Sequence, residues 1–151
     1  MEELEVTKLL QNRTTGVVLT LAIVALAMTT SIIHFRLGGL LFTLNSIGYA
    51  GLAVMYVIGA IAPSALVERF SWFPRLALPG FAAMTIAGYL VVGPYFTLGW
   101  ITKGVEVALI TLVALDVVRV YGSPFGLVRT AWTSVFGTSE ATGERGTAAT
   151  A

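Results

Sequence analysis

The stretch that decides the fold is residues 37–67, LGGLLFTLNSIGYAGLAVMYVIGAIAPSALV, which contains no Asp, Glu, Lys or Arg. Two further uncharged runs lie on either side of it, at 14–35 and 76–102. In chain order the three runs hold 22, 31 and 27 residues. A helix needs roughly 20 residues to cross about 30 Å of hydrocarbon, so each run predicts a membrane-spanning helix.

The composition of the whole chain agrees with this interpretation. Of the 151 residues, 56% are hydrophobic and 11% are charged, and the mean hydropathy is +0.86. Soluble domains carry roughly 25% charged residues. The net charge of +1 argues against a nucleic-acid partner, and the absence of cysteine excludes a disulfide scaffold. We therefore expect an integral membrane protein in contact with membrane lipid.

A fourth spanning helix is predicted from a shorter run. The nine apolar residues between Glu106 and Asp116 would reach only about 13 Å, so they span only if both carboxylates enter the membrane. A helix over 102–121 has the necessary 20 residues. The sequence therefore predicts an all-α fold, with a four-helix transmembrane bundle over residues 14–121.

The basic residues predict the orientation of this bundle. Four crossings place both termini on one side, which would hold seven of the nine Lys and Arg residues, and only Arg36 and Lys103 fall on the other. Because such an excess marks the cytoplasmic face, we expect a multi-pass protein of the plasma membrane with both termini cytoplasmic. A cleaved signal peptide is the competing interpretation of the first run, but the acidic start of the chain disfavours it.

The segments outside the four helices have their own patterns. Phe70, Trp72 and Phe73 are typical of an interfacial aromatic belt. Ser123-Pro124 is a helix start that precedes apolar residues at helical spacing. We expect a cytoplasmic N-terminal segment (1–13), an interfacial connection (63–79), an interfacial amphipathic helix (123–136) and a disordered tail (137–151).

Small residues are expected to hold the helices together, because apolar helices in lipid associate through close packing and interhelical hydrogen bonds. We expect this packing within one chain, with a homo-oligomer interface as the alternative. Pro79 is placed at the start of the third helix, and Pro94 should kink or end that helix. The small residues in question are Gly48, Gly51, Gly59, Gly80, Ala83, Ala87 and Gly88.

The sequence contains few candidate catalytic residues. With one histidine and no cysteine, one chain offers no two-histidine haem site, no thiolate metal site and no Cys/His dyad. A glycine-rich phosphate loop is also missing. We therefore expect no enzymatic activity, no catalytic residues and no metal site.

Polar residues at membrane depth form the candidate ligand or partner cluster, because such residues are expensive in lipid. Asn45 and Tyr49 are four residues apart and share one helix face. The alternatives are ion pairs that fix the depth of a marginal helix, hydrogen bonds between helices, and proton or cation handling by a buried carboxylate. The cluster comprises His34, Arg36, Asn45, Tyr49, Lys103 and Glu106.

Two segments carry a family resemblance: HFRLGGLLFTLNSIGY at 34–49 and GWITKGVEVALI at 99–110. They resemble small uncharacterised four-helix integral membrane proteins of bacteria and archaea. In these, a Phe-x-x-Asn-x-x-Gly-Tyr stretch opens the second helix and Lys-x-x-Glu opens the fourth. The resemblance covers roughly residues 14–118. It implies the four-helix fold and brings no known reaction, cofactor or partner.

These observations favour a non-enzymatic polytopic protein, an accessory or assembly subunit that packs with other membrane chains or with its own copies. One alternative is a quinone-, haem- or pigment-binding subunit that uses His34 with Asn45, Tyr49 or Arg36. Another is a small transporter or channel that uses Glu106. Four helices are few for a transport path, so that alternative needs an oligomer.

Overall fold

The computed structural model describes residues 12–62 and 64–137, and within these residues it contains six α-helices and no strand. The predicted all-α fold is therefore confirmed. Most of the expected N-terminal segment (1–13) and of the expected disordered tail (137–151) lies outside the described residues. The helices are α2 (Arg13–Leu37), α3 (Leu40–Ile61), α4 (Ala65–Phe70), α5 (Trp72–Val92), α6 (Thr97–Tyr121) and α7 (Pro124–Phe136).

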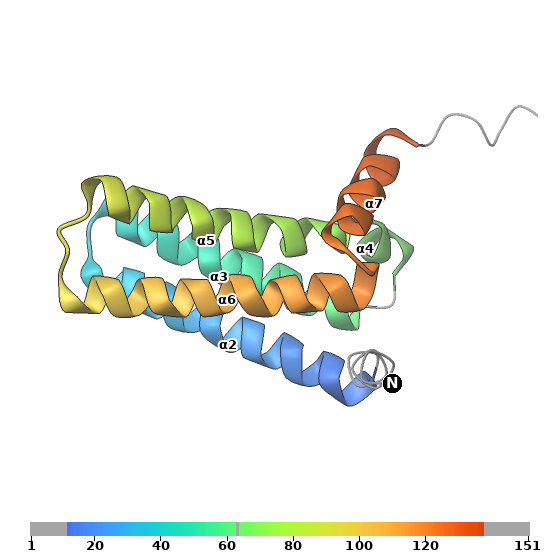
Figure 1. Ribbon diagram of the computed structural model, residues 1–151, viewed down its shortest axis with the longest axis horizontal. Helices are drawn as coiled ribbons and strands as arrows, with labels where there is room; N and C mark the ends of the chain where they lie inside the picture. The colour runs from blue at the N-terminus through green and yellow to red at the C-terminus, as the bar shows by residue number, and fades with distance from the viewer. Residues whose placement is uncertain (1–11, 63, 138–151) are drawn as a thin grey trace, which may run out of the picture.

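The four long helices, α2, α3, α5 and α6, lie side by side (Figure 1). α2 packs against α3 and α6, and α5 packs against the same two helices, so the four form a closed ring. The α2–α3 and α5–α6 connections lie at one end of the bundle, which we call the pocket end. The start of α2 lies at the other end with α4 and α7 (Figure 1).

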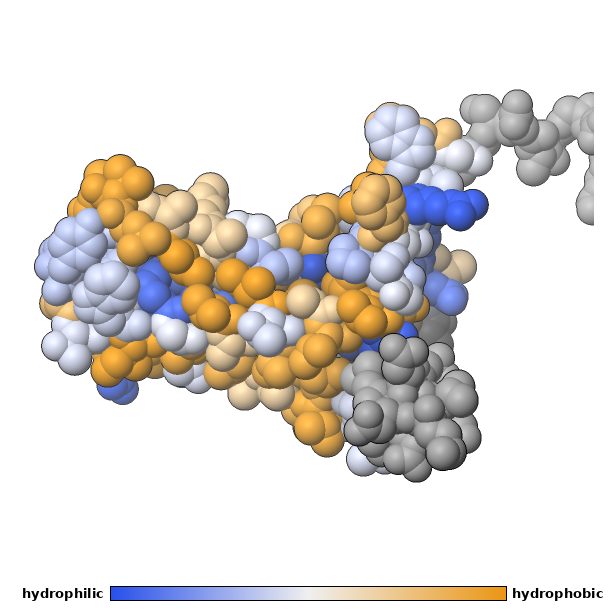
Figure 2. Space-filling view, in the orientation of Figure 1, coloured by the Kyte–Doolittle hydropathy of each residue, from blue (hydrophilic) through white to orange (hydrophobic). Residues whose placement is uncertain are grey.

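Three helical segments are long and apolar enough to cross a membrane: Arg13–Leu37, Leu40–Ile61 and Ala65–Val92. Large apolar side chains such as Leu21 and Val91 are exposed on them, as lipid-facing side chains would be. Apolar side chains run along the long helices on the face shown in Figure 2. These features are those of a membrane protein.

Local sequence explains where several helices begin and end. The Asn12 side chain caps α2, and Ser123 caps α7. Gly38 and Gly39 form the whole connection between α2 and α3 with φ values of 70° and 83°, a region that glycine enters without strain. Gly122, with φ of 74°, ends α6.

Two predicted boundaries were wrong. Pro79 lies inside α5 instead of at its start, because the expected interfacial connection is itself largely helical and α5 already begins at Trp72. α6 begins at Thr97, five residues before the predicted start at 102. α5 ends at Val92, just before Gly93 and Pro94, as a proline requires, so the apolar residues that follow are left to α6.

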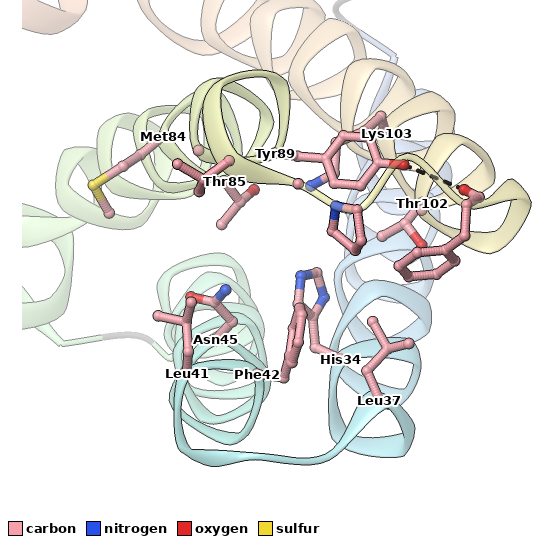
Figure 3. Close-up of a pocket in the computed structure, with 16 residues that line it drawn as sticks. His34, Leu37, Leu41, Phe42, Asn45, Met84, Thr85, Tyr89, Thr102 and Lys103 are labelled. Carbon is pink, nitrogen blue, oxygen red and sulfur yellow. Dashed lines mark hydrogen bonds between the residues drawn. The ribbon is translucent and has the colours of Figure 1, made fainter.

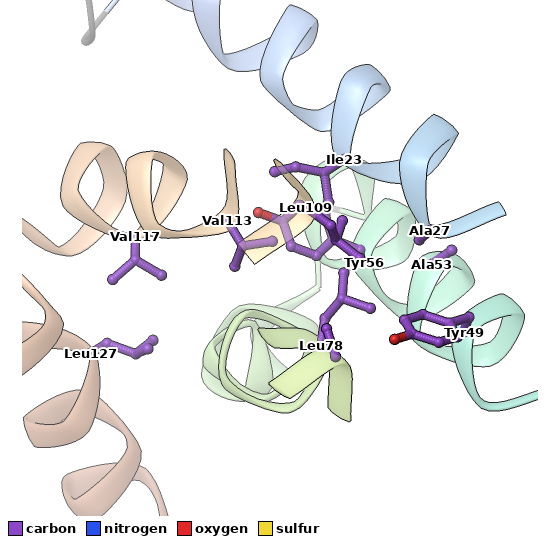
Figure 4. Close-up of a cluster of buried hydrophobic side chains, with 11 residues drawn as sticks. Ile23, Ala27, Tyr49, Ala53, Tyr56, Leu78, Leu109, Val113, Val117 and Leu127 are labelled. Atoms are coloured by element: carbon purple, nitrogen blue, oxygen red, sulfur yellow. The ribbon is translucent and has the colours of Figure 1, made fainter. Parts of the chain in front are cut away.

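The expected packing of small residues is found at two of the glycines considered, closely at Gly48 and at ordinary contact distance from Ser71 at Gly59. The place of a Cβ atom on Gly48 lies 2.6 Å from Cζ of Phe81, so any larger residue would force the Phe81 ring to shift at this contact between α3 and α5. The same place at Gly51, Gly80 and Gly88 has no atom within 4 Å. Larger side chains instead fill the core between the long helices, including Ile23, Tyr56, Leu78, Leu109 and Val113 (Figure 4).

Candidate functional site

The charged residues of α6 lie on its buried face. Lys103, Glu106 and Asp116 share this face with Leu109 and Val113, because all five recur at spacings of three or four residues. Both carboxylates are 0% exposed. The bundle therefore encloses two ionic groups, one toward each end.

The Asp116 group is fully hydrogen-bonded. Oδ2 of Asp116 accepts from the Tyr56 hydroxyl at 2.5 Å and from Nε of Arg75 at 2.8 Å. Oδ1 accepts from Nε of Arg119 at 2.9 Å and from Nη2 at 2.7 Å. Because its carboxylate joins α3, α5 and α6 and both its oxygens are paired, we interpret Asp116 as a structural anchor.

Sequence reasoning missed two members of this anchor. Tyr56 lies seven residues after Tyr49 on α3, a spacing that places both on one helix face and was a usable signal. Arg75 was counted only among the basic residues on the side of the termini, as four crossings require. Its guanidinium is buried and lies 5.1 Å from the centre of the Tyr56 ring, a contact that the sequence did not indicate.

The Glu106 group is only half-bonded. Oε2 of Glu106 accepts from Nζ of Lys103 at 2.5 Å. Oε1 is buried and has no hydrogen-bond partner among the described residues. Its nearest ionisable neighbour across the bundle is Nε2 of His34 on α2, at 3.9 Å. A buried acceptor without a donor is unfavourable, so the unpaired oxygen of Glu106 needs an explanation. The Asp116 anchor needs none, because both its oxygens are paired.

A pocket of about 330 Å³ opens beside this group at the pocket end (Figure 3). Its wall is mostly apolar, with contributions from all four long helices and from the α5–α6 connection. Figure 3 shows the His34 ring in the space between Asn45, Tyr89 and Thr102. The polar side chains on the wall are His34, Asn45, Thr85, Tyr89, Thr102 and Lys103.

Five of the six predicted cluster residues come together here. His34, Asn45 and Lys103 line the pocket, and Glu106 contacts two of them from behind the wall. The Tyr49 ring lies 5.6 Å from the His34 ring, and its hydroxyl forms a 2.9 Å hydrogen bond with Thr85. The sixth residue, Arg36, is exposed and is not part of the pocket wall.

Tyr89 and Thr85 are pocket residues that sequence reasoning missed. They are four residues apart on α5, so they share a face that the sequence alone could have revealed. The Tyr89 hydroxyl donates to the Phe96 carbonyl at 3.2 Å and ties α5 to the connection that closes the pocket end. The Lys103 ammonium lies 5.6 Å from the centre of the Tyr89 ring, a cation–π contact that holds the lysine at the wall.

Within residues 12–62 and 64–137, no three His, Cys, Asp or Glu side chains lie close enough together to hold a metal ion. In comparisons with known proteins, no family model matches the chain, and neither a curated protein nor a solved structure matches it. The geometry of the pocket and of the Glu106 group is therefore the basis for an assignment of function.

Proposed function

We propose that the chain is an integral membrane protein with four spanning helices, whose function is to bind a small, largely apolar molecule in the pocket. α6 is the fourth span. It has the same length as α2, 25 residues, and lies along the three apolar segments from end to end (Figure 1). Its carboxylates face inward, and side chains on its outer face, such as Val107 and Leu115, are apolar.

The orientation follows from the two ends of the bundle. α4, α7 and the start of α2 share the end that carries the excess of basic residues (Figure 1). We place this end, and with it both termini, on the cytoplasmic side of the plasma membrane. The pocket then opens near the outer side of the bilayer.

The observation that carries the binding proposal is an open, mostly apolar pocket with a few convergent polar groups, enclosed by the four long helices. This is the usual composition of a small-molecule site. Polar side chains in a membrane are costly and tend to serve function. The volume of about 330 Å³ is near the lower limit for such sites, so it favours a one- or two-ring molecule, such as a quinone headgroup, over a haem or another tetrapyrrole pigment.

The polar groups on the wall are suited to binding an oxygen atom. Lys103 has N–H donors beyond the one that it gives to Glu106, and the Asn45 amide can both donate and accept. A carbonyl or hydroxyl oxygen near Lys103 would therefore find a partner, while the apolar wall takes the rest of the molecule. We propose a binding role without catalysis.

The experiment that tests this proposal fills the pocket from α5. Gly88 lies in the middle of the stripe of pocket residues on that helix, and a Cβ atom added there meets no atom within 4 Å. Gly88→Leu should therefore occupy the pocket without disturbing the packing. Gly80→Leu is the matched control, since Gly80 is also surrounded by open space on α5 but does not line the pocket.

We expect wild-type protein and Gly80→Leu, purified in mild detergent, to retain the same small molecule in a lipid extract analysed by mass spectrometry. Gly88→Leu should lose it at least tenfold. Equal amounts in all three proteins, or no enriched molecule in any of them, would contradict the binding proposal.

The other two roles stay predictions. An accessory or assembly subunit needs a partner chain, and a transporter or channel needs an oligomer with a path past Glu106. Glu106 is fully buried between helices of its own chain, so the site geometry favours the pocket as the place of function.

A further inference from the structure

The hydrogen bonds of His34 determine which of its ring nitrogens carries a hydrogen. Nδ1 lies 2.9 Å from the backbone carbonyl oxygen of Thr30, one turn earlier on α2. A carbonyl oxygen only accepts, so Nδ1 must donate. In the neutral ring, Nε2 then has a lone pair and acts as an acceptor.

The His34 side chain is buried, and its Nε2 faces another acceptor. His34 is 4% exposed, and its Nε2 lies 3.9 Å from Oε1 of Glu106, the carboxylate oxygen without a hydrogen-bond partner among the described residues. With the ring neutral, Nε2 and Oε1 are two acceptors that face each other without a hydrogen between them. Such an arrangement is unfavourable unless something else supplies the hydrogen.

No donor on the helices packed around His34 forms a hydrogen bond with its Nε2 among the described residues, although the Asn45 amide lines the same pocket. On α6, the Lys103 ammonium bonds to the other oxygen of Glu106. On α3, the Tyr49 hydroxyl is paired with Thr85, and on α5 the Tyr89 hydroxyl donates to the backbone of Phe96. His34 itself lines the pocket, so the missing donor can reach Nε2 from that side.

We infer that the pocket is built for a ligand with a hydroxyl group, of the phenol or hydroquinone class, whose O–H donates to Nε2 of His34. This inference rests on the proposed function and specifies its ligand. The negative Glu106 behind the ring favours a donor at this point and disfavours a carbonyl oxygen. The same hydroxyl oxygen can accept from Lys103, which lines the pocket with His34, so one group satisfies both side chains.

The test compares thymol, an apolar one-ring phenol, with its methyl ether, which lacks the donor. Binding to the detergent-solubilised full chain is measured by equilibrium dialysis against empty micelles. We expect thymol to bind about tenfold more tightly than the ether, the effect of one buried hydrogen bond. Gly88→Leu should bind neither compound, and Gly80→Leu should bind both like the wild type.

Glu106→Gln tests whether thymol binds more tightly than its ether because of its hydrogen bond or because the ether carries a bulkier methyl group. The introduced amide must turn its oxygen to Lys103, which only donates, so its nitrogen faces His34 and donates to Nε2. The Gln amide then supplies the hydrogen that the ligand hydroxyl would supply, and the ratio of thymol affinity to ether affinity should fall to about one. If the tenfold preference persists in this variant, the methyl group explains it and the inference is wrong.

A second measurement does not depend on any variant. His34 is the only histidine of the chain, so its imidazole gives an unambiguous nitrogen NMR spectrum. We expect hydrogen on Nδ1, none on Nε2, and a change in the Nε2 signal when thymol binds. Hydrogen on Nε2 in the free protein, or equal binding of thymol and its ether to the wild type, overturns the inference. The binding proposal itself is tested separately, by the effect of Gly88→Leu on the retained molecule and on the binding of both compounds.

Discussion

Glu106 and Asp116 lie on one face of the same helix, and both are fully buried, yet their surroundings give them different roles. Both oxygens of Asp116 are bonded to donors from three helices. One oxygen of Glu106 has no donor, and it lies next to a pocket. The first arrangement ties three helices together. The second leaves an unpaired acceptor next to His34, which lines the pocket.

Asp116→Asn should destabilise the protein by about 3 kcal/mol, because it leaves the buried Arg75 and the part-buried Arg119 without their anion and points an N–H group at a donor. The matched control is Thr111→Val, an exposed position on α6 whose hydroxyl only bonds to the carbonyl of its own helix. The free energy of unfolding can be measured by denaturant titration in detergent micelles. Equal stability of Asp116→Asn and the control would contradict the anchor.

Helical spacing in the sequence predicted part of the site correctly. The intervals Asn45 to Tyr49 and Lys103 to Glu106 are three or four residues, so each pair shares a face wherever the helix packs. Arg36 was included because it has the same depth as His34. Two residues along a helix are a rotation of about 200°, which turns Arg36 away from the pocket. Depth alone does not specify the direction of a side chain.

At the scale of elements, α7 is the clearest feature outside the four long helices. It leaves the end of the bundle at a steep angle (Figure 1). Arg69 of α4 donates from Nε to the Ser134 carbonyl oxygen of α7 at 3.0 Å, and Leu127 of α7 is buried. Phe125 and Trp132 on the opposite side are 86% and 65% exposed. This distribution favours a helix that lies in the membrane interface.

We therefore expect Trp132 to lie near the headgroups. With Trp72 and Trp100 replaced by Phe, Trp132 is the only tryptophan, and its fluorescence in vesicles should be quenched most by lipids brominated close to the headgroup. Trp132→Phe in the same background is the blank. If an aqueous quencher quenches Trp132 as efficiently as it quenches free tryptophan, α7 is exposed to water and the interfacial placement is wrong.

The boundaries of elements were harder to predict than their existence. In the charge-free run 76–102, Pro94 indicated where one helix ends, but nothing marked the start of the next helix at Thr97. The predicted packing of small residues was also only partly correct. Gly48 packs against Phe81, whereas Gly80 faces open space, because spacing alone does not tell a lipid-facing stripe from a packed one.

At the scale of the whole molecule, the central claim is that α6 crosses the membrane with its charges turned inward. Among the described residues, three segments qualify as spans by length and composition, and α6, which carries four charged residues, is not one of them. The structure compensates for each carboxylate with cations inside the bundle. A charged helix of this kind can lie in lipid because its outer face is apolar.

Cysteine labelling tests this claim most directly, since the chain has no cysteine of its own. Thr97 and Arg129 are both exposed and lie on either side of α6 along the chain. A membrane-impermeant maleimide added to intact cells should label Thr97→Cys and leave Arg129→Cys unlabelled until the membrane is permeabilised. Labelling of both positions from the same side of the membrane would contradict the four-span account.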